Sequence, residues 1–292
     1  HAATVEAISK AVKNFIIPIE KGGDEDKLNT LQAIIKPFIL RRTKKQVAKD
    51  LPEKTEQVIY CEMHPEQKSL YEKVKSKYRN EILNSIAKYG VNKSKMYVIK
   101  GLTELRQIAN HPQLTETDFE DHSGKFEEII RMTETAINEG HKVLLFSQFV
   151  RFLNLFRTYF DGKNIQYCYL DGSTKSKDRA AQVDEFQNIE KLSLFLISLK
   201  AGGTGLNLTA ADYVFIADPW WNPASERQAI DRSHRIGQTQ NVFSYKFISK
   251  ATVEEKILSL QEKKKELSEA IITVEDSFIK QLSAIDIESL FD

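Results

Sequence analysis

The stretch that decides the fold reads Leu194-Phe-Leu-Ile-Ser-Leu-Lys200-Ala-Gly-Gly-Thr-Gly-Leu-Asn207. Its first half is an apolar run from Leu194 to Leu199, which is typical of a buried strand. Its second half is rich in glycine. Small residues after a buried strand let the backbone approach a ligand closely, and successive N–H groups can bind an anion. The pattern therefore predicts a phosphate-facing loop at the end of this strand.

Two common nucleotide-binding motifs are absent from the sequence. A dinucleotide-binding fingerprint would need a third glycine at position 208, which is Leu208. No stretch has the Walker A pattern of glycine, four residues and Gly-Lys-Ser/Thr. The chain thus has a candidate phosphate-facing loop but no loop of its own that cradles a nucleotide.

A second informative run follows downstream, from Gln228 to Gln238: Gln228-Ala-Ile-Asp-Arg232-Ser-His-Arg235-Ile-Gly237-Gln238. If the helix expected from Ala224 continues to Arg235, then Gln228, Arg232 and Arg235 share one face. Two arginines on one face suit a polyanion, because guanidinium groups bind phosphate oxygens bidentately and keep their charge. Gly237 would then follow the helix end. A solvated helix face is the alternative interpretation.

Strands and helices alternate after Gly124, which indicates a parallel sheet with right-handed crossovers. The expected strands are Val143–Phe146, Tyr167–Leu170, Leu194–Ile197, Tyr213–Ala217 and Val242–Phe247. Ligands gather at the carboxyl ends of such strands. Four loops with distinctive chemistry leave those ends, at 147–149, 171–174, 200–207 and 218–223. Before Gly124 we expect a short strand, Val58–Met63, and then helices from about Pro65 to His111, broken near Gly90.

Composition and charge bound the function. The 292 residues have a formal net charge of +1, no run of eighteen apolar residues and no signal-peptide pattern, so membrane and secretion functions are disfavoured. Cys61 and Cys168 lack metal-ligand spacing and are expected to be reduced structural thiols. Residues 36–49 carry six positive charges and no negative one, and residues 68–106 hold ten Lys and Arg against three Glu. Such basic stripes are typical of nucleic-acid binding, although lysine-rich solvated helices produce them too.

The four loops and the arginine run, in this order, resemble the second RecA-like lobe of the Swi/Snf-type DNA translocases, a branch of helicase superfamily two. Upstream, Pro37-Phe-Ile-Leu-Arg41-Arg42-Thr-Lys44 and Leu51-Pro-Glu-Lys54 resemble the segment that crosses between the lobes of that family. The helical insert at 64–112 is short, as in compact bacterial members. Lys200 stands where eukaryotic relatives often have arginine.

The resemblance implies an α/β fold, with a RecA-like three-layer parallel sheet, an N-terminal helical insert and a C-terminal brace helix. It divides the chain into residues 1–57, the end of the first lobe and the crossing segment; 58–123, a helical protrusion and linker; 124–250, the second lobe; and 251–292, the brace and tail. It also implies a motor that uses ATP with magnesium and moves along double-stranded DNA without separating its strands. The first lobe, with the Walker A lysine and the magnesium-binding acids, is not visible in this chain.

By the same resemblance, Arg232 and Arg235 would be the catalytic arginine fingers. The nucleotide side would include Gln228, Gly203, Thr204 and Gly205. Contacts to DNA would come from Gln148, Ser173, Lys200 and Trp221, with Arg41 and Arg42 as weaker candidates. The expected partners are duplex DNA, the N-terminal lobe of the same protein and RNA polymerase or another DNA-bound protein. The expected location is the cytoplasm and nucleoid, or the nucleus.

Other functions remain open at this stage. A module that docks on DNA or RNA polymerase without its own catalysis would have no reason to keep the arginine run beside the glycine loop. A nucleotide-dependent enzyme such as a glycosyltransferase is disfavoured by the missing dinucleotide fingerprint and metal-binding acids. Within the motor family, a strand-separating helicase or an RNA polymerase recycling factor is also compatible with the sequence.

Overall fold

The computed structural model describes residues 51–119, 123–202, 205–221, 223–268 and 284–292, together with a few isolated positions before residue 51. By internal contacts the chain forms two units, His1–Asp50 with Glu269–Ile272, and Leu51–Ser268 with Thr273–Asp292. The sheet and all the helices described below belong to the second unit. The expected end of the first lobe falls almost entirely outside the described residues.

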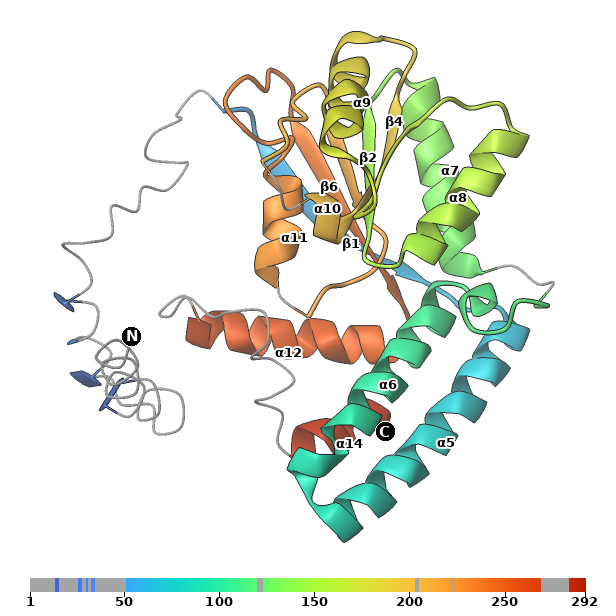
Figure 1. The fold of residues 1–292 in the computed structure, drawn as a ribbon, viewed down its shortest axis with the longest axis vertical. Coiled ribbons are helices and arrows are strands. Elements are labelled where there is room, and N and C mark those ends of the chain that lie inside the picture. Colours follow the sequence, from blue (N-terminus) through green and yellow to red (C-terminus); the bar gives the residue numbers. More distant parts are fainter. Residues whose placement is uncertain are drawn as a thin grey trace. The chain divides into compact units, whose positions relative to one another are not determined.

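A six-stranded sheet forms the centre of this unit (Figure 1). Its order is β1-β6-β5-β2-β4-β3, and every neighbouring pair is parallel. The strands are β1 Lys54–Cys61, β2 Val143–Ser147, β3 Cys168–Leu170, β4 Leu194–Ser198, β5 Tyr213–Ile216 and β6 Val242–Ser249. The expected α/β class with a RecA-like parallel sheet is confirmed.

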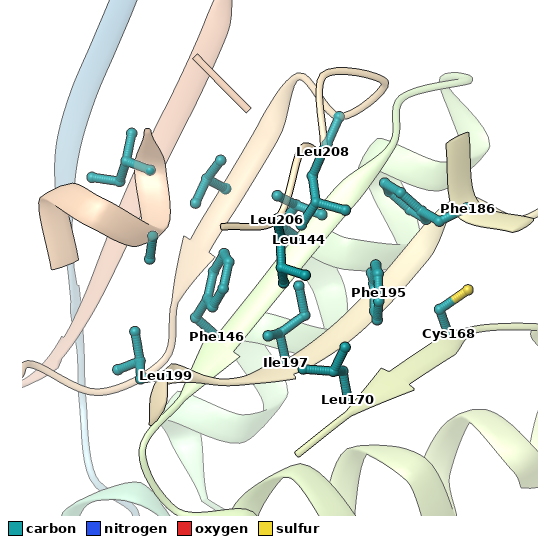
Figure 2. Close-up of a cluster of buried hydrophobic side chains, with 14 of the residues drawn as sticks. Leu144, Phe146, Cys168, Leu170, Phe186, Phe195, Ile197, Leu199, Leu206 and Leu208 are labelled. Carbon is teal, nitrogen blue, oxygen red and sulfur yellow. The ribbon is translucent and has the colours of Figure 1, made fainter. Parts of the chain in front are cut away.

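Both faces of the sheet are covered by helices, as expected for all-parallel strands. Alternate residues of β2 point to opposite faces. Leu144 and Phe146 join a core with Phe186 of α9 and Ile230 of α11, and Figure 2 shows part of that core. The alternating residues Val143 and Leu145 of β2 join a second core on the other face, with residues of α7 and α8. The helices are α7 Gly124–Asn138, α8 Val150–Gly162, α9 Ser176–Asn188, α10 Leu199–Gly202 and α11 Pro223–Ile230.

The helical insert is a hairpin of two helices, α5 (Pro65–Tyr89) and α6 (Val91–Asn110), which lies below the sheet in Figure 1. Gly90, at φ 77°, makes the break between the helices that the sequence predicts. A short 3-10 helix, η2 (Pro112–Leu114), follows. A third core joins this hairpin to α12 (Val253–Ser268) and α14 (Ala284–Phe291). The C-terminal helices therefore hold the insert beside the sheet.

Strand β1 changes one expectation. The sequence predicts a short strand at Val58–Met63 and assigns the sheet to residues after Gly124, whereas β1 begins at Lys54 and forms an eight-residue parallel ladder with β6. The expected domain boundary at residue 57 falls inside this strand. The reason is geometric, because β6 would otherwise be an open edge, and pairing with β1 satisfies its main-chain groups.

The two cysteines are buried and free, and burial raises the pKa of Cys61 to about 11. Among the described helices, none combines the length and apolar character that crossing a bilayer requires. No group of three or more His, Cys, Asp and Glu side chains in the described part of the chain is arranged to hold a metal ion.

Candidate nucleotide and DNA site

The four loops singled out in the sequence leave neighbouring strands. Strands β5, β2, β4 and β3 are consecutive in the sheet. Because these strands are parallel, their carboxyl ends lie along one edge, where ligands bind in sheets of this kind. The sequence thus identified a set of loops that the fold brings to a single edge.

The helix of the arginine run is shorter than predicted. Helix α11 ends at Ile230, so the predicted single helical face of Gln228, Arg232 and Arg235 is wrong. After Ile230 the main chain tightens, with the N–H of Ser233 donating to the carbonyl of Ile230 at 3.2 Å. We call residues 231–238 the arginine turn. Both arginines of the run lie in this turn, and Gly237, at φ 104°, lies near its end.

Contacts with other parts of the chain explain why the helix stops. The carbonyl of Arg232 accepts a hydrogen bond from the N–H of Leu208 at 3.0 Å. The ring Nε2 of His234 lies 2.9 Å from the carbonyl oxygen of Pro52. The side chain of Gln238 donates to the carbonyl of Ala211 at 2.8 Å. These bonds replace helical ones and join the arginine turn to the loop that follows β4.

The two arginines of the turn differ in exposure. Arg232 is 9% exposed, whereas Arg235 is exposed. Burial lowers the pKa of Arg232, the positive charge of Arg235 lowers it further, and the carboxylate of Asp231 offsets part of this. An anion placed beside the two guanidinium groups would relieve both effects. The turn therefore presents one buried and one exposed guanidinium group whose charges interact, although not on the single helical face that the sequence predicts.

The other predicted nucleotide-side residues are only partly described. Gln228 is exposed on α11, and Gly205 is exposed with φ 54°, a conformation that favours glycine. Gly203 and Thr204 lie outside the described residues. An open groove of about 570 Å³ runs between α9 and residues 205–207. Gln187 of α9 ties the two sides together by accepting a 2.8 Å hydrogen bond from the N–H of Ala210.

The predicted DNA-contacting residues occupy three separate loops and the short helix α10. Ser173 is exposed in a turn where its hydroxyl donates to Asp171 at 2.6 Å, and this bond lowers the pKa of that carboxyl. Lys200 is exposed on α10, and Gln148 is half-buried after β2. Trp221 is half-buried and packs against the core of the helical hairpin. Arg41 and Arg42 lie outside the described residues.

Residues 218–221, which we call the anchored loop, are held by buried polar contacts. The carboxylate of Asp218 accepts from the hydroxyl of Ser147 and from the N–H of Gln148, the latter at 3.3 Å. This carboxylate is fully buried, and burial raises its pKa to about 6. The N–H of Trp220 donates to Glu226 of α11 at 2.6 Å. The loops after β2 and β5 are therefore fixed to each other.

Sequence reasoning missed one residue of this region, Arg106 of α6. It is fully buried, and its guanidinium donates to the carbonyl of Pro219 and lies 3.6 Å from Asp218. A local signal was present, because this arginine interrupts the apolar stripe of α6. Nothing local indicated its partner, which is 113 residues away.

A second buried pair lies close by. Lys125 of α7 donates to Glu254 of α12 at 2.7 Å and to Asn110 of α6 at 2.8 Å. Both charged side chains of the pair are fully buried. The main-chain N–H of Ser249, at the end of β6, also donates to Glu254 at 2.9 Å. The helical hairpin, the brace helix and the sheet meet at this cluster.

Two family models match this chain, one over the region of the sheet after Gly124 and one over the region before it. Residues 124–237 match the Helicase conserved C-terminal domain, and residues 7–114 match the SNF2-related domain. The Bacillus subtilis (strain 168) protein YwqA is 38% identical over 289 residues, covering 96% of this chain and 30% of YwqA. The chain thus spans about a third or less of the length of the curated relatives it matches.

Solved structures agree. The Sulfolobus solfataricus SWI2/SNF2 ATPase core in complex with dsDNA is 36% identical, with a TM-score of 0.69, over 97% of this chain and 59% of that one. The SWI2/SNF2 ATPase C-terminal domain of the same organism is 32% identical, with a TM-score of 0.67, over 82% of this chain and 98% of that one. Sequence and fold agree over the whole of that domain, and the chain belongs to the SWI2/SNF2 ATPase family.

Proposed function

We propose that this chain is the C-terminal half of an ATP-dependent motor that moves along double-stranded DNA. The proposal is supported by the family, by the match to a relative solved with duplex DNA, and by the arginine turn beside the loop after β4. ATP would bind between this lobe and a first RecA-like lobe that carries the Walker A lysine and the acids for magnesium. On this proposal the chain alone does not hydrolyse ATP.

The observation that carries the proposal is the position of the arginine turn. The carbonyl of Arg232 accepts a hydrogen bond from the N–H of Leu208 in the loop that follows β4, and Arg232 and Arg235 are close enough for their positive charges to interact. In phosphoryl transfer, negative charge develops on the equatorial oxygens, and an arginine that contacts them accelerates the reaction by about 10³–10⁵. Arg235, being exposed, would reach the transferred phosphate, and Arg232 would contact a neighbouring one.

Other residues would support these contacts. Gln228 would hydrogen-bond near the nucleotide through its amide. Gly203, Thr204 and Gly205 would form the movable part between the nucleotide cleft and the DNA groove, since a loop without bulky side chains can shift as the lobes close. Magnesium with ATP supplies charge neutralisation at the phosphates, and the acids that hold it belong to the first lobe.

The DNA side would use Gln148, Ser173, Lys200 and Trp221. Hydroxyl, amide and ammonium groups on successive loops suit the phosphates of one strand, and contacts of this kind are independent of sequence and weaken with salt. Arg41 and Arg42 would add to the positive surface. Duplex DNA is therefore the proposed track, with RNA polymerase or another DNA-bound protein as the proposed obstacle or cargo.

The experiment is ATP turnover by a two-lobe protein that contains this chain, measured without DNA, with single-stranded DNA and with duplex DNA. The proposal expects stimulation mainly by duplex DNA. Equal stimulation by single strands would indicate a strand-separating helicase. ATP turnover that is the same with and without DNA would contradict the proposal and favour a polymerase-docking module.

A further inference from the structure

The guanidinium of Arg106 lies between two aromatic rings from different loops. Its central carbon is 5.4 Å from the ring centroid of Phe149, which follows β2, and 5.0 Å from that of Trp221, which follows β5. It also donates to the carbonyl of Pro219 and faces the carboxylate of Asp218. One side chain of the helical hairpin thus contacts two of the three loops that carry predicted DNA contacts.

This arrangement is costly for packing alone. Burial lowers the pKa of Arg106, and the carboxylates of Asp218, Glu254 and Glu226 oppose this effect. The Nε of Arg106 has no hydrogen-bond partner among the described residues. Apolar residues of similar volume often stabilise a protein as well as a buried ion pair does. What they cannot do is fix the position of a main-chain carbonyl, a carboxylate and two ring faces at once, which a planar group with five donors can.

The anchored loop is also held from its other sides. Gln261 of α12 donates to the carbonyl of Trp220, and Glu226 of α11 pairs with Lys246 of β6 while accepting from Trp220. The loop therefore has little freedom to move by itself. A displacement of α6 would move it together with the Gln148 backbone, which is bonded to Asp218.

We propose that Arg106 is a positioning residue that makes the helical hairpin, the loop after β2 and the anchored loop move as one body. It sets the placement of Gln148 and Trp221 toward DNA. The proposal rests on the proposed function, since it concerns how ATP turnover is converted into movement along DNA. Arg106 itself does not contact ATP or DNA.

The test replaces Arg106 and Asp218 together, because Arg106→Met alone would leave the carboxyl group of Asp218 buried without its cation. In a two-lobe motor containing this chain, we would measure ATP turnover with duplex DNA and base pairs travelled per ATP for Arg106→Met with Asp218→Asn. We expect turnover to stay within about threefold and travel per ATP to fall on the order of tenfold, as misplaced contacts can do from a distance. Arg106→Lys, which keeps the charge but not the planar fork, should fall in between.

The matched control is Lys125→Met with Glu254→Gln, a nearby buried ion pair that acts on Arg106 and Asp218 through charge and is removed here as a neutral pair. It should reduce thermal stability without changing the travel per ATP of the molecules that remain folded. If both double variants lowered travel and turnover in proportion to their loss of stability, Arg106 would be structural and the inference would be overturned.

A readout on the chain itself separates this inference from the proposed function. In a Trp220→Phe background, acrylamide quenching of Trp221 fluorescence should increase in the double variant Arg106→Met, Asp218→Asn, because one face of the Trp221 ring loses its cover. Unchanged quenching would overturn the inference even if the motor behaves as proposed. Absence of duplex-stimulated turnover in the unmodified motor would overturn the proposed function, and the quenching result would still stand.

Discussion

The arginine turn and the anchored loop lie at opposite ends of the sheet and are built in opposite ways. The turn is bonded to Ala211 and Pro52, which precede β5 and β1, whereas the anchored loop follows β5. The turn holds two arginines whose positive charges repel each other, and one of the two, Arg235, is exposed. The anchored loop presents a buried carboxylate whose oxygens accept hydrogen bonds from Ser147 and Gln148. The turn holds two like charges close together with one of them exposed, whereas the loop is held by hydrogen bonds within the chain.

The difference indicates a division of labour between the two ends of the sheet. A site that meets a changing ligand gains from charged groups that are already in place for that ligand. A segment that transmits movement gains from contacts that do not change, since rigid, fully bonded elements move as units. If so, changes in the arginine turn should affect ATP turnover, and changes around the anchored loop should affect the distance travelled per ATP.

The largest effect is expected at the turn. Arg235→Ala should lower DNA-stimulated ATP turnover of the two-lobe motor by about 10³, because the developing phosphate charge loses its arginine. Affinity for duplex DNA should stay nearly unchanged. Steady-state ATPase assays and DNA binding measured on the same preparation check both expectations.

Arg227→Ala is the matched control for this prediction. Arg227 is an exposed arginine on α11, a few residues before the turn. Alanine takes away the same charge and keeps the main-chain carbonyl that accepts from the N–H of Asp231, so turnover should remain near that of the unmodified motor. Loss of DNA binding in step with turnover in Arg235→Ala would argue that the arginine contacts DNA instead.

The sequence was sufficient to predict the sheet because its evidence is local. Apolar runs such as Val143–Phe146 and the glycine that breaks the hairpin at Gly90 specify strands and turns through neighbouring residues alone. The strand before the hairpin was found too, but not its pairing with β6, since nothing in Val58–Cys61 says which edge it will join. The carboxyl-edge loops follow directly from the order of strands.

What the sequence could not predict depends on distant partners. The helix before the arginines stops early because Leu208 and Pro52 take over hydrogen bonds, and helical spacing carries no information about either. Lys125 and Glu254 are 129 residues apart and show no pattern that marks them as a buried pair. The roles assigned to single residues at the site stay predictions, because they depend on ligands that this chain meets at its surface.

The next effect sharpens the comparison through stability. Lys125→Met should lower the free energy of unfolding by about 3–5 kcal/mol, because it leaves the carboxylate of Glu254 buried without its cation. Adding Glu254→Gln should recover part of this loss. Chemical denaturation monitored by circular dichroism measures both. Arg235→Ala, measured alongside, should change stability little, and a comparable loss there would blur the distinction between the two regions.

A smaller effect is expected at Trp221. Trp221→Ala removes the ring that lies against Arg106 and should reduce base pairs travelled per ATP by about tenfold while much of the ATP turnover remains. Trp221→Phe keeps an aromatic face and should recover most of the coupling. Triplex displacement measured together with phosphate release gives the ratio. Equal loss of turnover and travel in the alanine variant would point to a tryptophan that only stabilises the fold.

The smallest effect concerns pH and belongs to Asp218. Burial raises the pKa of this carboxyl to about 6, against about 3.9 in an unfolded chain. Between these two values the folded chain binds a proton that the unfolded chain does not, so this group's contribution to stability falls as pH rises toward 6. Lowering the pH from about 7 to about 5 should therefore add about 1 kcal/mol from this group. The lowered pKa of Asp171 acts in the opposite sense and only at more acidic pH. Asp218→Asn should remove the contribution, so the difference between the two stability curves isolates it from the histidines. Curves that stay parallel would mean that Arg106 and Ser147 compensate the carboxylate better than its burial implies. Asp218 would then be charged throughout the neutral and mildly acidic pH range.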